Sequence, residues 1–180
     1  MIQLKPAING NDHIWGNINA PLELVEYGDF QCEHCGYAYP IIKNIQRKLG
    51  TNLKFVFRNF PLSEIHQNAV NAALATEAAG LQDKFWEMFD IIFENQNALD
   101  DESIFSYAQK IGLDLKRFKN DIQKTELVSK VEQDFESGLR SGVNGTPTFF
   151  INGKKYNGDW EEHVLFQYLK NQMTGVSISQ

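Results

Sequence analysis

Residues 30–35 read Phe-Gln-Cys-Glu-His-Cys, and the two cysteines of this segment decide how the rest of the chain is interpreted. Cys32 and Cys35 are the only 2 cysteines in the 180-residue sequence. A disulfide between cysteines this close together closes a very small loop, so it makes a poor structural cross-link in any compartment. The pair therefore indicates chemistry, either thiol-disulfide exchange or metal binding.

A predicted strand precedes the two cysteines and a predicted helix follows them. Residues 22–27 are apolar, with β-branched and aromatic side chains, and they end at Gly28. Residues 33–49 carry apolar side chains at helical spacing, and Pro40 predicts a break within that helix. The cysteines are thus expected at a helix N-terminus, where unpaired N–H groups and the helix dipole favour negative charge.

This position predicts different roles for the two cysteines. Cys32, at the start of the helix, is expected to ionise more readily than a free thiol and to act as the nucleophile. Cys35 is expected to lie deeper, to be less ionised, and to attack the mixed disulfide formed at Cys32. Between them, His34 would stabilise the thiolate and make the disulfide more oxidising, whereas Glu33 would oppose it by like-charge repulsion.

The middle of the chain predicts a second strand and then a block of helices. Residues 53–58 alternate as a strand does, and a right-handed crossover makes this strand parallel to the first. Residues 66–142 contain no convincing strand and show four helical patterns, whose apolar side chains are interpreted as core packing rather than as a ligand groove. The breaks between these patterns are predicted at 80–83, 95–101, 112–114 and 125.

The end of the chain predicts a hairpin and a final helix. Residues 148–151 read as a short aromatic strand, and residues 154–156 as its partner. Between them, Asn152-Gly153 is a strong signal for a type I′ turn. Residues 159–169 then form an amphipathic helix with one apolar face. The expected order of elements is therefore β, α, β, helical block, β, β, α.

A second motif, Gly145-Thr146-Pro147-Thr148, places a proline at the start of a predicted strand. The Thr146-Pro147 bond is a candidate for the cis form, which would turn the Thr146 backbone toward the cysteines. Its N–H and C=O groups would then be free to pair with an extended substrate segment. From the local sequence alone, an ordinary trans proline is favoured, because only about 6% of such bonds are cis.

The CxxC segment between a strand and a helix, the Gly-Thr-Pro-Thr stretch before the hairpin, and the helical block between them together resemble the DsbA family of the thioredoxin superfamily. The resemblance implies a bacterial thiol-disulfide oxidoreductase with an α/β thioredoxin fold, in which helices flank a mixed sheet of four or five strands. It implies one domain over residues 1–180, with an all-helical insertion at about 64–142 between the βαβ and ββα halves.

The resemblance also assigns roles to particular residues. It implies that Pro147 is a cis-proline facing the redox pair, that Thr146 contacts substrate, and that Glu33-His34 tunes the reduction potential. Glu26 matches the buried acidic residue that the family places behind the resolving cysteine, where a carboxylate with a raised pKa could accept the Cys35 proton. The alternative for Glu26 is an exposed carboxylate paired with a lysine. Asp29 is a weaker candidate for the same role, because it is expected in a solvated turn.

Composition and charge limit the partners of this protein. A net charge of -6, with no run of Lys or Arg longer than two, predicts no binding to nucleic acid or to anionic lipid. No segment approaches the ~18 apolar residues of a transmembrane helix, which predicts a soluble protein. Protein thiols and disulfides are the expected substrates, with a redox partner protein or glutathione completing the cycle. A monomer without cofactor or metal is expected.

The first twenty residues bear on location. They contain no apolar run like the core of a signal peptide, which predicts the cytoplasm, or the periplasm if Met1 is not the native start. Glu33 also stands where the periplasmic oxidant of the family has proline. In a reducing cytoplasm a dithiol stays reduced, so reduction, isomerisation or repair of disulfides is expected more than strong oxidation. The direction of the reaction stays open.

Two other classes of protein remain as alternatives. Cys32, Cys35 and His34 could belong to a zinc-binding module, although no further cysteine and no paired His motif completes a four-ligand site. A glutathione-dependent transferase or isomerase has a similar architecture, but that class normally uses a single Ser or Cys. Thiol-disulfide exchange is therefore the preferred interpretation.

Overall fold

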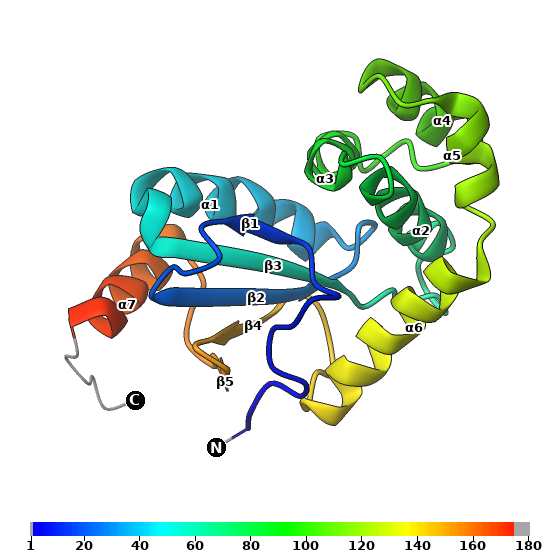
Figure 1. Ribbon diagram of the computed structural model, residues 1–180. Coiled ribbons are helices and arrows are strands. Elements are labelled where there is room, and N and C mark those ends of the chain that lie inside the picture. Colours follow the sequence, from blue (N-terminus) through cyan, green and yellow to red (C-terminus); the bar gives the residue numbers. More distant parts are fainter. Residues whose placement is uncertain (1, 175–180) are drawn as a thin grey trace.

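A mixed sheet forms the centre of the structure, which is a computed structural model that describes residues 2–174. Within those residues it has five strands in the order β1-β3-β2-β4-β5 (Figure 1). The central strand β2 runs parallel to β3 and antiparallel to β4, as the predicted βαβ and ββα halves require. The strand bounds are β1 (Ile14–Gly16), β2 (Leu22–Gly28), β3 (Leu53–Asn59), β4 (Thr148–Ile151) and β5 (Lys154–Lys155).

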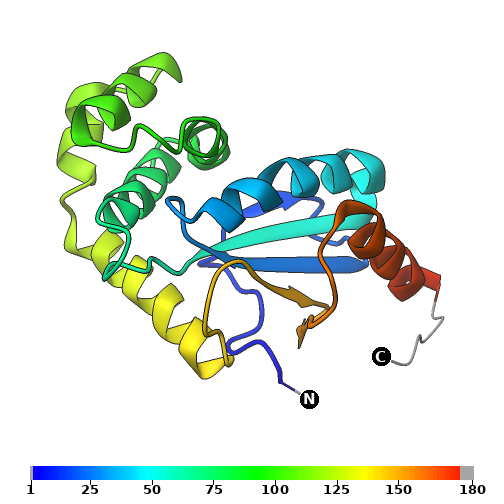
Figure 2. The same cartoon turned by 180° about the vertical axis from the view of Figure 1, so that it is seen from behind.

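Helices cover both faces of the sheet. On one face lie α1 (Glu33–Leu49) and α7 (Glu162–Thr174), which pack on apolar side chains such as Leu24 and Phe55. On the other face lie α6 (Thr125–Arg140) and the N-terminal segment, opposite α1 (Figures 1 and 2). Because successive side chains of a strand point to opposite faces, Glu26 of β2 points to the same face as Leu24. The predicted α/β fold class is confirmed.

The helical insertion lies between β3 and β4 and contains five helices within the described residues, one more than the four patterns predicted. Each of the four predicted breaks separates two of these helices, so the chain starts a new helix after every break. Asp100 and Asp114, for example, accept hydrogen bonds from the Ser103 and Arg117 N–H groups and so cap new helices. Besides α6, the helices are α2 (Ala69–Gly80), α3 (Phe85–Phe93), α4 (Asp101–Lys110) and α5 (Leu115–Asp121).

The α1 helix continues through Pro40, so the predicted break is wrong. Proline removes a single N–H donor from a helix, and buried side chains on both sides of it, including Ala38 and Ile42, hold α1 against the core. The final helix begins at Glu162 rather than at 159, because Asp159 accepts a hydrogen bond from the Glu161 N–H group in a local turn.

The predicted turn of the β4–β5 hairpin is confirmed. Asn152 and Gly153 have φ values of 48° and 75°, the left-handed conformation that a type I′ turn requires at both central positions. The partner strand β5 is shorter than predicted and ends at Lys155.

The first twenty residues contain a strand that their sequence did not predict. In this N-terminal segment, β1 pairs antiparallel with β3 at the edge of the sheet.

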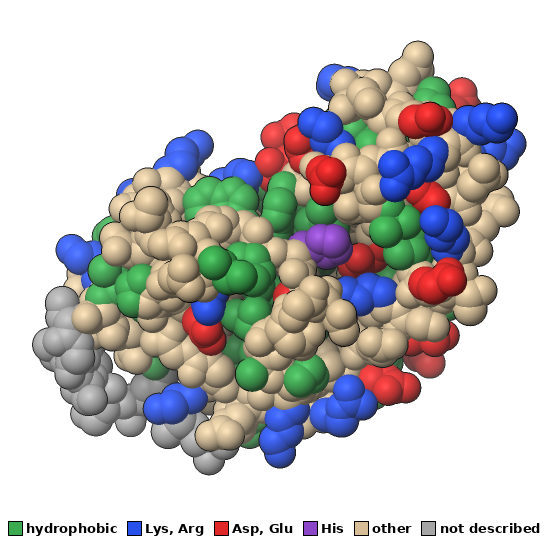
Figure 3. Space-filling model, viewed as in Figure 1, with side chains coloured by type: hydrophobic (Ala, Val, Ile, Leu, Met, Phe, Trp, Pro, Cys, Tyr) green, Lys and Arg blue, Asp and Glu red, His purple; other side chains and the backbone are tan. Residues whose placement is uncertain are grey.

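Charged side chains of both signs are interspersed over the helical insertion on the face of the molecule shown in Figure 3. Among residues 2–174, the structure contains no helix that is both long enough and apolar enough to span a bilayer. The absence of nucleic-acid and lipid partners stays a prediction.

A buried ion pair fastens the N-terminal segment to the sheet. The Arg58 side chain of β3 is 1% exposed, and its guanidinium donates to both carboxylate oxygens of Asp12 at 2.8 Å. It also donates to the Pro6 carbonyl oxygen and to the Tyr27 hydroxyl, each at 3.0 Å. Every partner of this guanidinium would lose a donor if the side chain were removed.

Replacing Arg58 by methionine should lower the free energy of unfolding by about 3–5 kcal/mol, because it leaves the Asp12 carboxylate buried without a counter-ion. Urea denaturation of the reduced protein measures this loss. Arg140→Met is the matched control, since Arg140 and its partner Glu136 are largely exposed, and it should cost less than about 1 kcal/mol. Similar small losses in both variants would contradict the assigned role of Arg58.

Candidate active site

The two cysteines lie where β2 ends and α1 begins, as predicted. Cys32 is the N-cap residue of α1, with extended backbone angles (φ −70°, ψ 123°), and Cys35 lies in the first turn of the helix. Cys32 is 6% exposed, Cys35 is fully buried, and both are free thiols. The structure therefore places a cysteine with slight exposure directly beside one that is fully buried.

The environment of Cys32 lowers its pKa from 9.0 to about 5. The largest cause is a hydrogen bond from the Cys35 thiol, and the Thr146 side chain and the backbone N–H groups of Cys35 and His34 add to it. Partial burial acts in the opposite direction. These donors favour the thiolate because a negative sulfur accepts hydrogen bonds more strongly than a neutral thiol does. Cys32 is thus ionised at neutral pH.

The pKa of Cys35 is raised well above its ordinary value, chiefly by burial and then by its hydrogen bond to Cys32 and the negative charge of Glu26. One group acts the other way, since the Asp29 N–H donates to Cys35 Sγ at 3.5 Å. The two sulfurs of one CxxC motif therefore have opposite protonation preferences.

Glu26 is 2% exposed in the middle of β2, between Phe57 of β3 and Phe149 of β4. Burial and, to a smaller extent, the negative charge of Cys32 together raise its pKa to about 8. The alternative of an exposed carboxylate paired with lysine describes another residue of the same strand, Glu23, whose carboxylate lies 2.7 Å from Lys54 Nζ. The burial expected for Glu26 is present, and its role as a proton acceptor stays a prediction.

Glu33 and His34 both lie on the exposed side of the first helical turn. The Glu33 carboxylate accepts a hydrogen bond from the Tyr37 hydroxyl at 2.6 Å, and the His34 ring lies edge-on to the Tyr37 ring. The lowered pKa of Cys32 is ascribed to the Cys35 thiol, Thr146 and backbone N–H groups rather than to either of these side chains. Their tuning of the reduction potential stays a prediction.

The Thr146-Pro147 peptide bond is cis, and it lies beside the redox pair. Cys32 Sγ lies 3.5 Å from the Thr146 carbonyl oxygen, to which it can donate only while it is a protonated thiol, although the two residues are 114 positions apart in sequence. The Thr146 hydroxyl oxygen, Oγ1, is buried and has no partner in regular hydrogen-bond geometry among the described residues. Tertiary structure thus brings the second sequence motif to the first, as the sequence analysis expected.

Asp29 is not in a solvated turn, so that prediction is wrong. Its side chain is fully buried and accepts hydrogen bonds from the Gln31 N–H at 2.7 Å and the Leu62 N–H at 2.8 Å. His66 Nδ1 lies 2.8 Å from Asp29 Oδ2, the oxygen that also accepts the Leu62 N–H. Leu62 and His66 belong to the segment that leads into the insertion, and this segment covers the turn. An Asp directly after a strand could have indicated a turn-capping role, but nothing local predicts the cover.

The three histidines other than His34 could complete a zinc site with the cysteines only if they lay beside them, and each has other neighbours. His13 Nε2 lies 2.8 Å from the Glu77 carboxylate, His66 pairs with Asp29, and His163 is exposed beside Glu161. Across residues 2–174, no group of three or more Cys, His, Asp and Glu side chains is arranged to hold a metal ion. A zinc-binding module would therefore need ligands from elsewhere.

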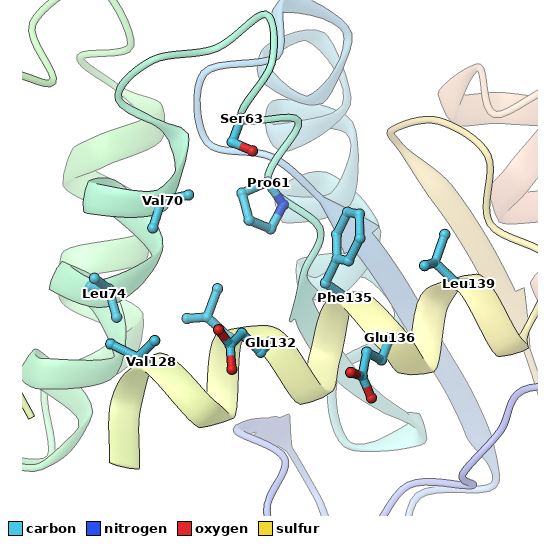
Figure 4. Close-up of a pocket in the computed structure, with 10 residues that line it drawn as sticks. Pro61, Ser63, Val70, Leu74, Val128, Glu132, Phe135, Glu136 and Leu139 are labelled. Atoms are coloured by element: carbon cyan, nitrogen blue, oxygen red, sulfur yellow. The ribbon is translucent and has the colours of Figure 1, made fainter. Parts of the chain in front are cut away.

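An apolar groove lies between α2 and α6, beside the loop after β3 (Figure 4). Its volume is about 660 Å³, and the only charged side chains that line it are Glu132 and Glu136. Several of its apolar side chains face water, with Leu139 54% exposed. The apolar lining consists of Pro61, Val70, Leu74, Val128, Val131, Phe135 and Leu139.

Comparisons with known proteins agree with this geometry. The family model described as thioredoxin matches residues 8–171. A curated relative, the Na(+)/H(+) antiporter NhaA 1 of Mycolicibacterium vanbaalenii, is 38% identical over 169 residues, which are 93% of this chain. NhaA 1 of Salinispora arenicola is 35% identical over 175 residues, or 97% of this chain. In both cases the match spans only 27% of the relative's length.

Solved structures of DsbA-like proteins have the same fold. Oxidised BdbD from Bacillus subtilis superimposes with a TM-score of 0.82 at 23% identity, over 97% of this chain and 98% of that chain. The thiol-disulfide exchange protein alpha-DsbA2 from Wolbachia pipientis gives 0.81 at 22% identity, over 91% and 88% of the two chains. The catalytic domain of Proteus mirabilis ScsC gives 0.79 at 18% identity, over 95% and 93%.

In the reduced protein, the Cys32 thiolate should titrate with a pKa near 5. Replacing Cys35 by alanine removes its largest stabilising hydrogen bond, so the pKa should rise by about one to two units. Ultraviolet absorbance of the thiolate as a function of pH measures both values, and Cys32→Ser identifies the signal. A wild-type pKa close to that of a free thiol would contradict the arrangement of donors described above.

Replacing Glu26 by glutamine should stabilise the protein increasingly between pH 5 and pH 8. In this window the folded wild type keeps a proton that the unfolded chain has released, because the pKa of Glu26 is about 8 when folded and 4.5 otherwise. The wild type therefore loses up to about 1.4 kcal/mol of stability per pH unit relative to the variant. Above pH 8 the difference should become constant.

Urea denaturation at a series of pH values measures that difference. The same experiment on Glu23→Gln is the control, because Glu23 is a partly exposed carboxylate on the same strand. A stability difference for Glu26→Gln that does not change with pH would show that this carboxyl group is not held protonated.

Proposed function

This chain belongs to the thioredoxin family, and on that premise we propose that it is a thiol-disulfide oxidoreductase acting on protein substrates through Cys32 and Cys35. The observation that carries the proposal is the opposite environment of the two sulfurs. Cys32 has its pKa lowered to about 5 at the surface, whereas Cys35 has its pKa raised beneath it. One sulfur is therefore prepared to attack and the other to wait.

In the reducing direction, the Cys32 thiolate attacks one sulfur of a substrate disulfide. A Cys32–substrate disulfide forms, the substrate disulfide breaks, and the other substrate sulfur leaves as a thiolate. Cys35 then loses its proton and attacks Cys32 Sγ, so that the Cys32–Cys35 disulfide forms and the second substrate thiolate is released. Two electrons pass from the protein to the substrate. In the oxidising direction the same steps run in reverse.

The proton of Cys35 must leave before this second attack, and Glu26 is the group we assign to accept it. Glu26 is buried on the α1-facing side of β2, and its charge is one of the causes that raise the pKa of Cys35. A carboxyl group with a pKa near 8 can take up and release a proton close to neutral pH. Formation of the Cys32–substrate bond removes the negative charge of Cys32. That charge is one of the causes that raise the pKa values of Glu26 and Cys35.

Substrate chain would lie against Thr146 and Pro147. The Thr146 backbone is next to Cys32 Sγ, and an extended segment can pair with exposed N–H and C=O groups as an added strand does. The apolar groove between α2 and α6 offers further contact area for a polypeptide. These features favour proteins over small disulfides as substrates, with a redox partner protein or glutathione as the second reactant.

The lowered pKa of Cys32 bears on direction. Stabilising the thiolate stabilises the reduced protein, so the disulfide becomes more oxidising than that of an unshifted pair. We propose that the compartment then selects the net reaction. In a reducing compartment such as the cytoplasm, the pair would be held reduced and would reduce or isomerise disulfides. The antiport named for the curated relatives is not part of this proposal.

The test is the redox equilibrium of Cys32–Cys35 against a glutathione buffer, followed by tryptophan fluorescence. We expect a reversible two-electron couple and reduction of insulin disulfides by the wild type. Cys32→Ser should abolish both, because it removes the nucleophile. Cys35→Ser should instead accumulate a stable mixed disulfide with substrate, which mass spectrometry detects. A protein with no reversible couple would not have the proposed function.

A further inference from the structure

Gln96 links the helical insertion to the backbone of the redox turn. It lies in the loop between α3 and α4, and its side-chain Nε2 donates to the Phe30 carbonyl oxygen at 2.8 Å and to the Cys32 carbonyl oxygen at 3.0 Å. These contacts join residues 66 and 64 positions apart in sequence. One amide group therefore holds both ends of the Phe30-Gln31-Cys32 segment.

The Cys32 carbonyl is also where α1 begins. It accepts the Gly36 N–H at 3.1 Å, the bond that closes the first turn of the helix. The N–H groups of His34 and Cys35, which belong to that turn, donate to Cys32 Sγ. Any movement of the Cys32 carbonyl would change the direction of these donors relative to the sulfur. Gln96 thus acts on the reactive sulfur through the backbone.

Gly36 makes room for this contact. A Cβ atom at position 36 would overlap Gln96 Oε1, and the three nearest atoms outside the neighbouring helix backbone all belong to the Gln96 side-chain amide. Gly36 lies within a helix and does not have a positive φ, so its backbone conformation alone does not require glycine. The glycine instead allows the Gln96 amide to lie directly against the first turn of α1.

We propose that Gln96 is a positioning residue, through which the helical insertion holds the Cys32–Cys35 turn in its reactive geometry. The inference rests on the oxidoreductase function proposed above and extends it to a residue that does not touch substrate. An amide suits this role because it can donate two hydrogen bonds to carbonyl oxygens without adding a charge beside the thiolate.

The turn does not depend on Gln96 alone for its folding. The insertion also contacts it through the Asn68 N–H, which donates to Gln31 Oε1 at 2.8 Å, and through Leu62 and His66, which bind Asp29. Removing the Gln96 amide should therefore loosen one side of the turn while the rest of the insertion stays in place. A change in reactivity can then be separated from a loss of structure.

Four variants test the inference. Gln96→Ala removes the amide, and Gln96→Glu replaces its donor by an acceptor that faces two carbonyl oxygens. Gly36→Ala keeps every polar group but displaces the amide, although alanine has a higher helix propensity than glycine. Asn97→Ala is the matched control, since Asn97 is the exposed neighbour of Gln96 in the same loop.

The readouts are the Cys32 thiolate titration, the equilibrium constant with glutathione, and thermal unfolding. Gln96→Ala and Gly36→Ala should raise the thiolate pKa and make the disulfide about three- to tenfold less oxidising, because the donors to Cys32 are less well aligned. Gln96→Glu should have the largest effect. Asn97→Ala should match the wild type, and all four proteins should unfold cooperatively.

The outcomes separate the inference from the function on which it rests. A wild type without a reversible couple would remove the proposed function itself. A normal wild-type couple that is unchanged in Gln96→Ala, or unchanged in a folded Gly36→Ala, would overturn the role of Gln96 and leave the function standing. Equal changes in Gln96→Ala and Asn97→Ala would also overturn it, because the effect would then belong to the loop.

Discussion

The structure depends on keeping two sulfurs of one helical turn in opposite protonation states. Cys32 needs donors around a sulfur that substrate can reach, and Cys35 needs a dry environment directly beneath it. The hydrogen bond from the Cys35 thiol to the Cys32 thiolate satisfies both requirements at once, since it stabilises the charge and keeps the proton on the buried sulfur. Placing the pair at the junction of β2 and α1 supplies the backbone N–H groups that complete the site.

The same arrangement determines how the stability of the reduced protein depends on pH. The lowered pKa of Cys32 stabilises the reduced fold as pH rises above about 5, whereas the raised pKa of Glu26 destabilises it until about pH 8. The two contributions have opposite signs over the same window. A buried carboxyl group behind a thiolate therefore has a smaller net effect on stability than either group alone would suggest.

The helical insertion is more than an addition to the central sheet, because it completes the turn that contains the cysteines. The Leu62 N–H and the His66 ring lie within hydrogen-bond distance of the Asp29 carboxylate. The Gln96 amide donates to the backbone carbonyl oxygens of Phe30 and Cys32. Within the turn, Phe30 is buried against Phe57, Phe89 and Phe93. The polar groups around it are held by hydrogen bonds to a part of the chain that lies more than thirty residues away in sequence.

The sequence by itself determined what is local or periodic: the strand, CxxC turn and helix around Cys32, the hairpin turn at Asn152, and the helical character of the insertion. The cis form of the Thr146-Pro147 bond was expected only from the resemblance to the DsbA family, because the local sequence favoured trans. Only the tertiary structure decided that Asp29 is buried and that Gln96 reaches the redox turn. The physical reason is that burial and hydrogen-bond partners depend on segments far apart in the chain, and no local pattern specifies which of them will meet.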